Sequence, residues 1–160
     1  MYDAHTLAQV AQTFDDAPSL DLVWGNVGYV DETGRALTLR YPHINPQSLL
    51  SATLCHQAVF ARRTLFERLG DFDLAYPICA DYDWQLRVLR GGAHYRYLDT
   101  GVAHFSPGGA SEQTMGRLYR EKARIRRKYL AWLPWIKLET HLALRRIRYR
   151  FNSWRYQLLS

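Results

Sequence analysis

The charge of this chain changes sign near residue 114, and this division constrains the fold more than any other feature of the sequence. Residues 1–114 contain 8 Lys and Arg against 13 Asp and Glu, a net charge of −5. Residues 115–160 contain 13 Lys and Arg against 2 Asp and Glu, a net charge of +11. The length of 160 residues allows one domain and an appendage. The basic segment favours contact with an anionic surface or polymer.

The acidic part alternates between helix-like and strand-like patterns, which predicts an α/β fold, α+β in its arrangement. With 48% hydrophobic and 22% charged residues, the composition is that of a globular protein. Apolar spacing and turn residues predict the following elements: a helix over 4–14, a β-hairpin within 21–41, a loop over 42–52, a strand over 55–63, helical turns over 64–70, a helix over 80–92, strands on both sides of a turn at 99–101, and a glycine loop over 106–111.

The basic part has a helical pattern from residue 112 onward, and we place a domain boundary there. Pro134 is expected to separate two helices because proline interrupts a helix interior. The second helix carries an apolar stripe between arginines: Leu144, Ile147, Phe151, Trp154 and Leu158. Three interpretations stay open for this basic amphipathic helical tail over 113–160. It lies on an anionic membrane surface, which we favour, or packs on the domain, or binds nucleic acid, which we favour least.

The two cysteines, Cys55 and Cys79, have no CxxC spacing and are too few for a disulfide framework, which fits a reducing cytosol. Cys55 precedes His56, and such a neighbouring pair raises the hypothesis of a thiol nucleophile. If both residues lie in the predicted strand, their side chains point to opposite faces and cannot activate one another. Thiol catalysis is therefore not expected.

Targeting and membrane-spanning segments are not expected. Residues 1–10 lack the basic and apolar regions of a signal peptide. The longest apolar run, 129–136, has eight residues, whereas a spanning helix needs about 20. These patterns predict a cytoplasmic protein that does not cross a membrane by itself.

Asp81 stands at the start of the predicted helix over 80–92 and is the first candidate for chemistry. A carboxylate there acts as a general base if it is partly buried and faces a substrate hydroxyl. It can also cap the helix, with Asp83 complementing the helix dipole. The residues alone favour the capping interpretation.

The segment 104–111 is the second candidate. Its loop supplies three possible phosphate-binding residues, Gly108, Gly109 and Ser111. A flexible connector is the favoured interpretation, because one glycine pair is weak evidence. His104 is a weak candidate for a metal ligand, since a lone histidine after a strand is more often a hydrogen-bonded structural residue.

The order of these segments resembles bacterial family 2 glycosyltransferases, inverting enzymes with a GT-A fold that build exopolysaccharide, including colanic-acid-type polymers, and lipopolysaccharide side chains. The resemblance covers about residues 1–130, and it is specific for the family but not for the sugar. Five segments carry it: LDLVWGNVGYVDETGR (20–35), CHQAVFARRTLFERLGDFD (55–73), ADYDWQLRVLRGGA (80–93), HYRYLDTGVAHFSPGGAS (94–111) and LYREKARIRRKY (118–129).

The resemblance implies roles for particular residues. The family's Glu-Asp pair falls on Ala80-Asp81, which makes Asp81 the general base that deprotonates the acceptor hydroxyl. Ala80 departs from the family's glutamate, so one carboxylate near the acceptor is missing. Arg87, like Asp83, is expected to anchor the helix more than to take part in chemistry. Four residues are the candidates for binding the acceptor: His56, Gln57, Asp83 and Trp84.

The implied reaction is transfer of a sugar from a nucleotide-sugar donor to a saccharide or lipid-linked acceptor during cell-surface polysaccharide synthesis, on the inner face of the cell membrane. Family members begin with a nucleotide-binding half, which ends in an acidic motif that holds Mg²⁺ or Mn²⁺. A segment like residues 2–7 follows that motif, so the chain matches the acceptor-side half over 1–112 of a partial GT-A fold. The pairs Asp71–Asp73 and Asp81–Asp83 have an Asp-x-Asp spacing, but they do not lie where the family has its metal-binding motif.

Two expectations follow from this partial match. Without a nucleotide-binding half, the chain alone is expected to be inactive, because the departing diphosphate needs charge neutralisation. It is also expected to aggregate, because an incomplete sheet exposes an edge. The alternative function is a non-catalytic basic-helix module that binds an anionic membrane or nucleic acid. The two readings differ in whether Asp81 lines an open cleft.

Overall fold

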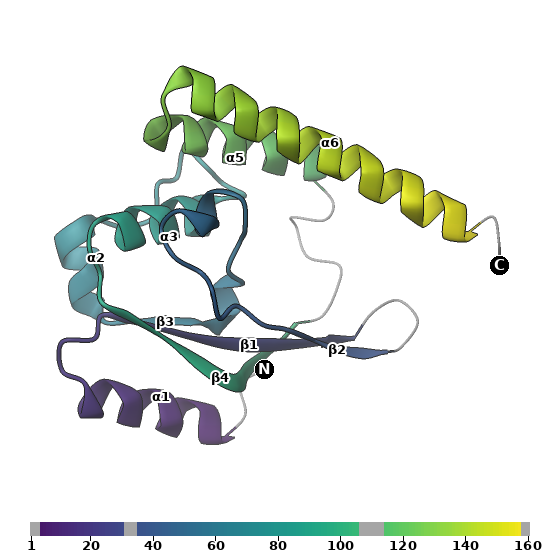
Figure 1. Ribbon diagram of the computed structural model, residues 1–160. Helices are drawn as coiled ribbons and strands as arrows, with labels where there is room; N and C mark the ends of the chain where they lie inside the picture. Colours follow the sequence, from purple (N-terminus) through teal and green to yellow (C-terminus); the bar gives the residue numbers. More distant parts are fainter. Residues whose placement is uncertain (1–3, 31–34, 106–113, 158–160) are drawn as a thin grey trace.

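The computed structural model describes residues 4–30, 35–105 and 114–157 (Figure 1). A sheet lies between helix α1 on one face and helices α3, α5 and α6 on the other side (Figure 1). The elements are α1 (Ala4–Asp16), β1 (Leu22–Val30), β2 (Ala36–Leu39), the 3₁₀ turns η1 (Ser48–Leu50) and η2 (His56–Ala58), β3 (Val59–Ala61), α2 (Arg63–Leu69), α3 (Ala80–Arg90), β4 (Tyr95–Phe105), α5 (Met115–Tyr129) and α6 (Trp132–Gln157). The predicted α/β class is confirmed, and the arrangement is compatible with a partial glycosyltransferase fold.

Strand β1 is the centre of the four-stranded mixed sheet. It pairs in parallel with β4, and antiparallel with both β2 and β3. Strand β2 pairs with residues 27–30 of β1, and β3 pairs with residues 22–24 of β1. Residues 22–27 are buried, because helices cover both faces of the sheet here. This explains the nearly continuous apolar sequence of the strand.

The hairpin within 21–41 and the three predicted helical segments before residue 92 are confirmed as β1–β2, α1, α2 and α3. Helix α2 ends at Gly70, whose φ of 82° is a conformation that favours glycine. The main core joins β1 to α3 and α5 through Trp24, Leu86 and Ile125, none of which is more than 1% exposed. Tyr82 anchors η1 to this core by donating its hydroxyl hydrogen to Leu49 O at 3.0 Å.

The predicted strand over 55–63 is wrong at its start. Residues His56–Ala58 form η2, which closes when Ala58 N–H donates to Cys55 O at 2.9 Å, and only Val59–Ala61 form a strand. Strand β3 is short because β2 already pairs with residues 27–30 of the central strand. His56 and Gln57 therefore lie on a turn, and the strand argument about Cys55 and His56 does not apply.

The predicted turn at 99–101 is an irregularity within one continuous strand, β4. Trp24 pairs with Tyr97, whereas Asn26 pairs with Gly101, so β4 accommodates extra residues. Asn26 Nδ2 donates to Asp99 Oδ1 at 2.9 Å, which satisfies the side chains at the bulge. The chain thus continues in its original direction where the sequence indicated a reversal.

The break between the last two helices precedes Pro134. Helix α5 ends at Tyr129 and α6 begins at Trp132. Pro134 is tolerated in the first turn of α6, where its missing N–H has no intrahelical partner to lose. The predicted boundary near 112 lies outside the described residues.

Helix α5 belongs to the core, although its composition is basic. Glu121 and Arg126 are 5% and 6% exposed. Arg126 Nη1 lies 2.7 Å from Glu139 Oε1, and Trp135 Nε1 donates to Ala123 O at 2.9 Å. These contacts hold α6 against α5, and the two helices lie next to each other in Figure 1.

Candidate active site

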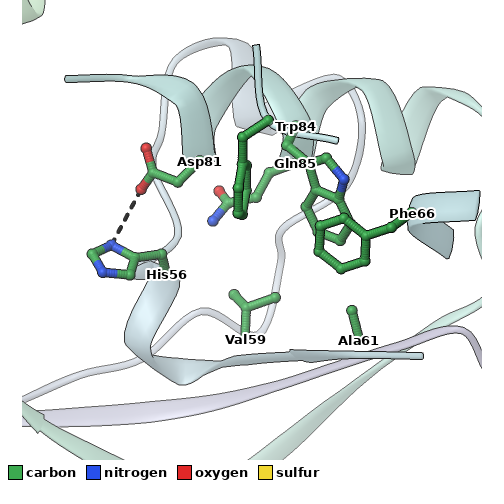
Figure 2. Close-up of a pocket in the computed structure, with 8 residues that line it drawn as sticks. His56, Val59, Ala61, Phe66, Asp81, Trp84 and Gln85 are labelled. Atoms are coloured by element: carbon green, nitrogen blue, oxygen red, sulfur yellow. Dashed lines mark ion pairs between the residues drawn. The ribbon is translucent and has the colours of Figure 1, made fainter. Parts of the chain in front are cut away.

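Asp81 faces a cleft at the start of helix α3. The N-cap position is Cys79, so the capping interpretation of Asp81 is wrong. Its Oδ1 accepts the Tyr82 N–H at 2.8 Å, and its Oδ2 lies 3.3 Å from Nδ1 of His56 (Figure 2). The side chain of Asp81 is 29% exposed. The carboxylate is therefore held in place and still reachable from solvent.

His56 comes from η2 and points at Asp81 across the cleft (Figure 2). The hydrogen bond to Asp81 raises the pKa of His56, against a smaller lowering by burial. Since the His56 side chain is 65% exposed, this pair contributes little to stability. Its main effect is to orient the carboxylate.

Two adjoining cavities share Asp81, His56 and Phe72. The smaller has a volume of about 200 Å³ and is lined further by residues of β3, α2 and α3, namely Val59, Ala61, Phe66, Trp84 and Gln85. The larger has a volume of about 820 Å³ and extends along 53–57, Leu74 and 77–82 to Met115, Leu118 and Lys122 of α5. Asp81 thus stands where two binding spaces meet.

Trp84 forms an aromatic wall of the smaller cavity. Its ring stacks on Phe66 with centroids 4.4 Å apart, and Phe72 packs edge-on against both rings. Trp84 Nε1 donates to Gly70 O at 3.1 Å, which fixes the indole. Because Trp84 is only 3% exposed, it supports the wall and offers little surface to a ligand.

Gln85 is a site residue that sequence reasoning missed. It is 2% exposed, and its amide points into the smaller cavity (Figure 2). Nε2 contacts Leu54 O at 3.5 Å, whereas Oε1 has no hydrogen-bond partner among the described residues. The available signal was the spacing from Asp81, because residues i and i+4 share a helix face.

Asp83 lines neither cavity, although the sequence made it a candidate for acceptor binding. Its side chain is 2% exposed, and its Oδ1 lies 2.8 Å from Lys128 Nζ of α5. Arg87 Nη2 lies 3.4 Å from the other oxygen. Burial lowers the pKa of Lys128, but the hydrogen bonds and charges of Asp83 and Tyr76 together outweigh this effect and the pKa is raised. Asp83 therefore anchors α3 to α5, as also expected from the sequence.

Gln57 and both cysteines line the larger cavity. Gln57 Oε1 lies 4.0 Å from Cys55 Sγ. Burial raises the pKa of the Cys55 thiol, and it raises that of Cys79 to about 11. Both sulfurs are therefore protonated at neutral pH, which argues against a thiolate nucleophile.

The metal and phosphate candidates are not joined to this site. His104 is an exposed residue of β4. Across 4–30, 35–105 and 114–157, no three His, Cys, Asp or Glu side chains come together as metal ligands. Gly108, Gly109 and Ser111 lie outside the described residues.

The known proteins that are similar to this chain share one kind of activity. No protein-family model matches the chain. Over 157 residues it is 29% identical to proteins named "PGL/p-HBAD biosynthesis glycosyltransferase" from Mycobacterium bovis (strain BCG / Pasteur 1173P2) and Mycobacterium tuberculosis (strain ATCC 25177 / H37Ra). The chain is similar to glycosyltransferases. The match covers 96% of this chain and 55% of each relative, so the chain spans about half the length of these curated relatives. Within the described residues, no helix has the length and apolar character needed to cross a membrane.

Titration of His56 tests the geometry at the cleft. We expect its pKa to lie above the ordinary 6.5 and to fall toward that value in Asp81→Asn, because the variant removes the charge that favours the imidazolium. NMR titration of the imidazole measures both values. The small stability that this raised pKa contributes is present in full below pH 6.5 and is lost as pH rises through the folded-state pKa.

A His56 pKa that does not respond to Asp81→Asn contradicts the described pair.

Proposed function

We propose that the chain is the acceptor-side part of an inverting, family 2-like glycosyltransferase with a GT-A fold. It transfers a sugar from a nucleotide-sugar donor to a saccharide or lipid-linked acceptor in cell-surface polysaccharide synthesis. The observation that carries the proposal is Asp81, a carboxylate that opens on a cleft between two cavities. The similarity to curated glycosyltransferases supports it independently.

Asp81 acts as the general base in this proposal. It accepts the proton of the acceptor hydroxyl while that oxygen bonds to the anomeric carbon and the bond from this carbon to the diphosphate oxygen breaks. The nucleoside diphosphate leaves with the bonding electron pair. His56 positions the carboxylate through its contact at 3.3 Å. The walls of the cleft hold the hydroxyl in line for attack.

The donor requires a nucleotide-binding part, which we propose is supplied by additional polypeptide. The relatives are nearly twice as long as this chain, which leaves room for such a part. Mg²⁺ or Mn²⁺ would neutralise the diphosphate there, and the role of Asp81 does not depend on this metal. Inactivity and aggregation of the isolated chain stay predictions.

A gene-deletion experiment tests the proposal in the cell, where any additional polypeptide is present. We expect mass spectrometry of surface glycans and glycolipids to show a product that lacks at least one sugar in the deletion strain. Expression of the wild-type gene should restore it. An unchanged glycan profile would contradict the proposed function and favour the non-catalytic alternative.

Helix α6 supports a peripheral location on the inner, anionic face of the cell membrane. Besides Trp132, four large apolar residues of α6 are exposed: Leu133, Ile136, Leu144 and Ile147. At 3.6 residues per turn they lie within an arc of about 80°. Exposed basic residues border this arc, namely Lys137, Arg145 and Arg148. An apolar stripe beside a basic face is typical of a helix that lies on an anionic lipid surface.

Vesicle binding tests this location. We expect the chain to bind vesicles that contain anionic lipid about 10-fold more tightly than neutral vesicles, with a loss of this preference at high salt. The double variant Leu144→Ser/Ile147→Ser should bind weakly in sedimentation assays. Leu7→Ser, at an exposed position of α1, is the matched control. Equal binding of both variants, or a preference for DNA over vesicles, contradicts the membrane proposal.

A further inference from the structure

Lys122 is the only Lys or Arg among the described residues that line the larger cavity. It projects from α5 together with Met115 and Leu118, at positions i, i+3 and i+7 of one helix face. Asp81 and His56 line the same cavity. A cation therefore lines the same cavity as the proposed base. The reaction proposed above gives this cation no role.

The contacts of Lys122 are with neutral groups. Its Nζ donates to Thr53 Oγ1 at 2.6 Å and lies 5.2 Å from the ring centroid of Tyr82. In the described part of the chain, no carboxylate oxygen lies within 4.0 Å of this nitrogen, so Lys122 forms no ion pair there. Since an ammonium has three N–H donors, at least one remains for a ligand.

The neighbouring acidic residue cannot neutralise Lys122, because it is already engaged. Glu121 Oε2 accepts the N–H groups of Ile78 and Cys79 at 2.9 and 3.1 Å, and Oε1 lies 2.9 Å from Arg117 Nε. Burial lowers the pKa of Lys122, with a smaller opposing effect from Asp81. A partly buried ammonium without a close counter-ion is stabilised by an anion that enters with a ligand.

Much of the remaining wall of the cavity is apolar. It includes Leu74, Pro77, Met115 and Leu118. Leu74 is 85% exposed and Met115 is 42% exposed, so both offer apolar surface to a bound molecule. A ligand that satisfies this space carries a negative group for Lys122 and an apolar or planar portion for the wall.

We propose that Lys122 is the anion-binding residue of the larger cavity and receives a phosphate group of a substrate beside the hydroxyl that Asp81 deprotonates. The phosphate belongs either to a lipid-linked acceptor or to the nucleotide-sugar donor. The apolar wall favours the lipid-linked acceptor. The identity of the substrate rests on the proposed function, whereas binding of phosphate does not.

Calorimetric titration of the full 160-residue chain tests this site with three probes: inorganic pyrophosphate, octyl phosphate and uridine diphosphate. We expect octyl phosphate to bind most tightly. Lys122→Met keeps the aliphatic stem but removes the charge. For every probe that binds the wild type, we expect this variant to bind about 10-fold more weakly, the effect of losing one charge-assisted hydrogen bond. Lys122→Arg should retain binding within a few-fold.

Arg63→Met is the matched control, since the Arg63 side chain is 93% exposed on α2 and lines neither cavity. Equal melting temperatures of the two methionine variants show that the fold is kept. Tighter binding of uridine diphosphate than of octyl phosphate supports the site and assigns the phosphate to the donor. Unchanged binding in Lys122→Met, or no binding of any probe at millimolar concentration, overturns the proposal.

Binding is measured without sugar transfer, so the two proposals fail separately. Phosphate binding through Lys122 with an unchanged glycan profile in the deletion strain contradicts the proposed function alone. An altered glycan profile with unchanged binding in Lys122→Met contradicts the anion site alone.

Discussion

Asp81→Asn is expected to lower the rate of sugar transfer by about 10²–10⁴-fold, the contribution of a positioned general base. Asparagine has nearly the same shape, and its amide oxygen can still accept the Tyr82 N–H that Asp81 accepts at 2.8 Å. It cannot take a proton from the acceptor hydroxyl at neutral pH. Because the Asp81 side chain is 29% exposed and pairs with an exposed His56, its loss of charge should change the melting temperature little.

The rate is measured with a labelled nucleotide sugar and membranes from cells in which the substitution is made in the gene, so that any additional polypeptide and the native acceptor are present. Thermal unfolding of the purified chain gives the melting temperature. A variant with wild-type transfer would remove Asp81 from the chemistry. A variant that fails to fold would show instead that Asp81 is structural.

Asp83→Asn is expected to have the opposite effect, a loss of about 3 kcal/mol of unfolding free energy, which corresponds to roughly 10 °C in melting temperature. The Asp83 side chain is 2% exposed and joins Lys128 and Arg87. The substitution leaves these two cations without their buried partner. The transfer rate per folded molecule should stay near that of the wild type, because Asp83 lines neither cavity.

Urea unfolding of the purified chain measures this loss. Glu67→Gln is the matched control, since the Arg63–Glu67 pair is 93% and 62% exposed and exposed pairs contribute at most about 1 kcal/mol. Equal losses in Asp83→Asn and Glu67→Gln would contradict the anchoring role of Asp83.

Local patterns predicted those elements whose partners lie nearby in the sequence. The hairpin of β1 and β2 and the helix α3 follow from alternation, helical spacing and the Gly91-Gly92 stop. The predicted strand at 55–58 failed because β2 and β3 pair with different parts of β1, residues 27–30 and 22–24, a division that no local pattern records. The bulge in β4 likewise depends on pairing with β1.

The candidate site was predictable in part. The resemblance singled out Asp81 and His56, which the structure brings within 3.3 Å. Gln85 and Lys122 were not recognised as site residues, because their position depends on how α3 and α5 enclose the cavities. The basic composition of 115–160 also concealed the buried ion pair of Arg126 with Glu139, since a charge count carries no information on burial.

The central claim is that the carboxylate at position 81, and not the one at position 83, carries out sugar transfer. The most direct test is the initial transfer rate per folded molecule, measured side by side for the wild type, Asp81→Asn and Asp83→Asn at a temperature where all three are folded. The account predicts a rate near background for Asp81→Asn and near wild type for Asp83→Asn. Equal rates in the two variants would contradict it.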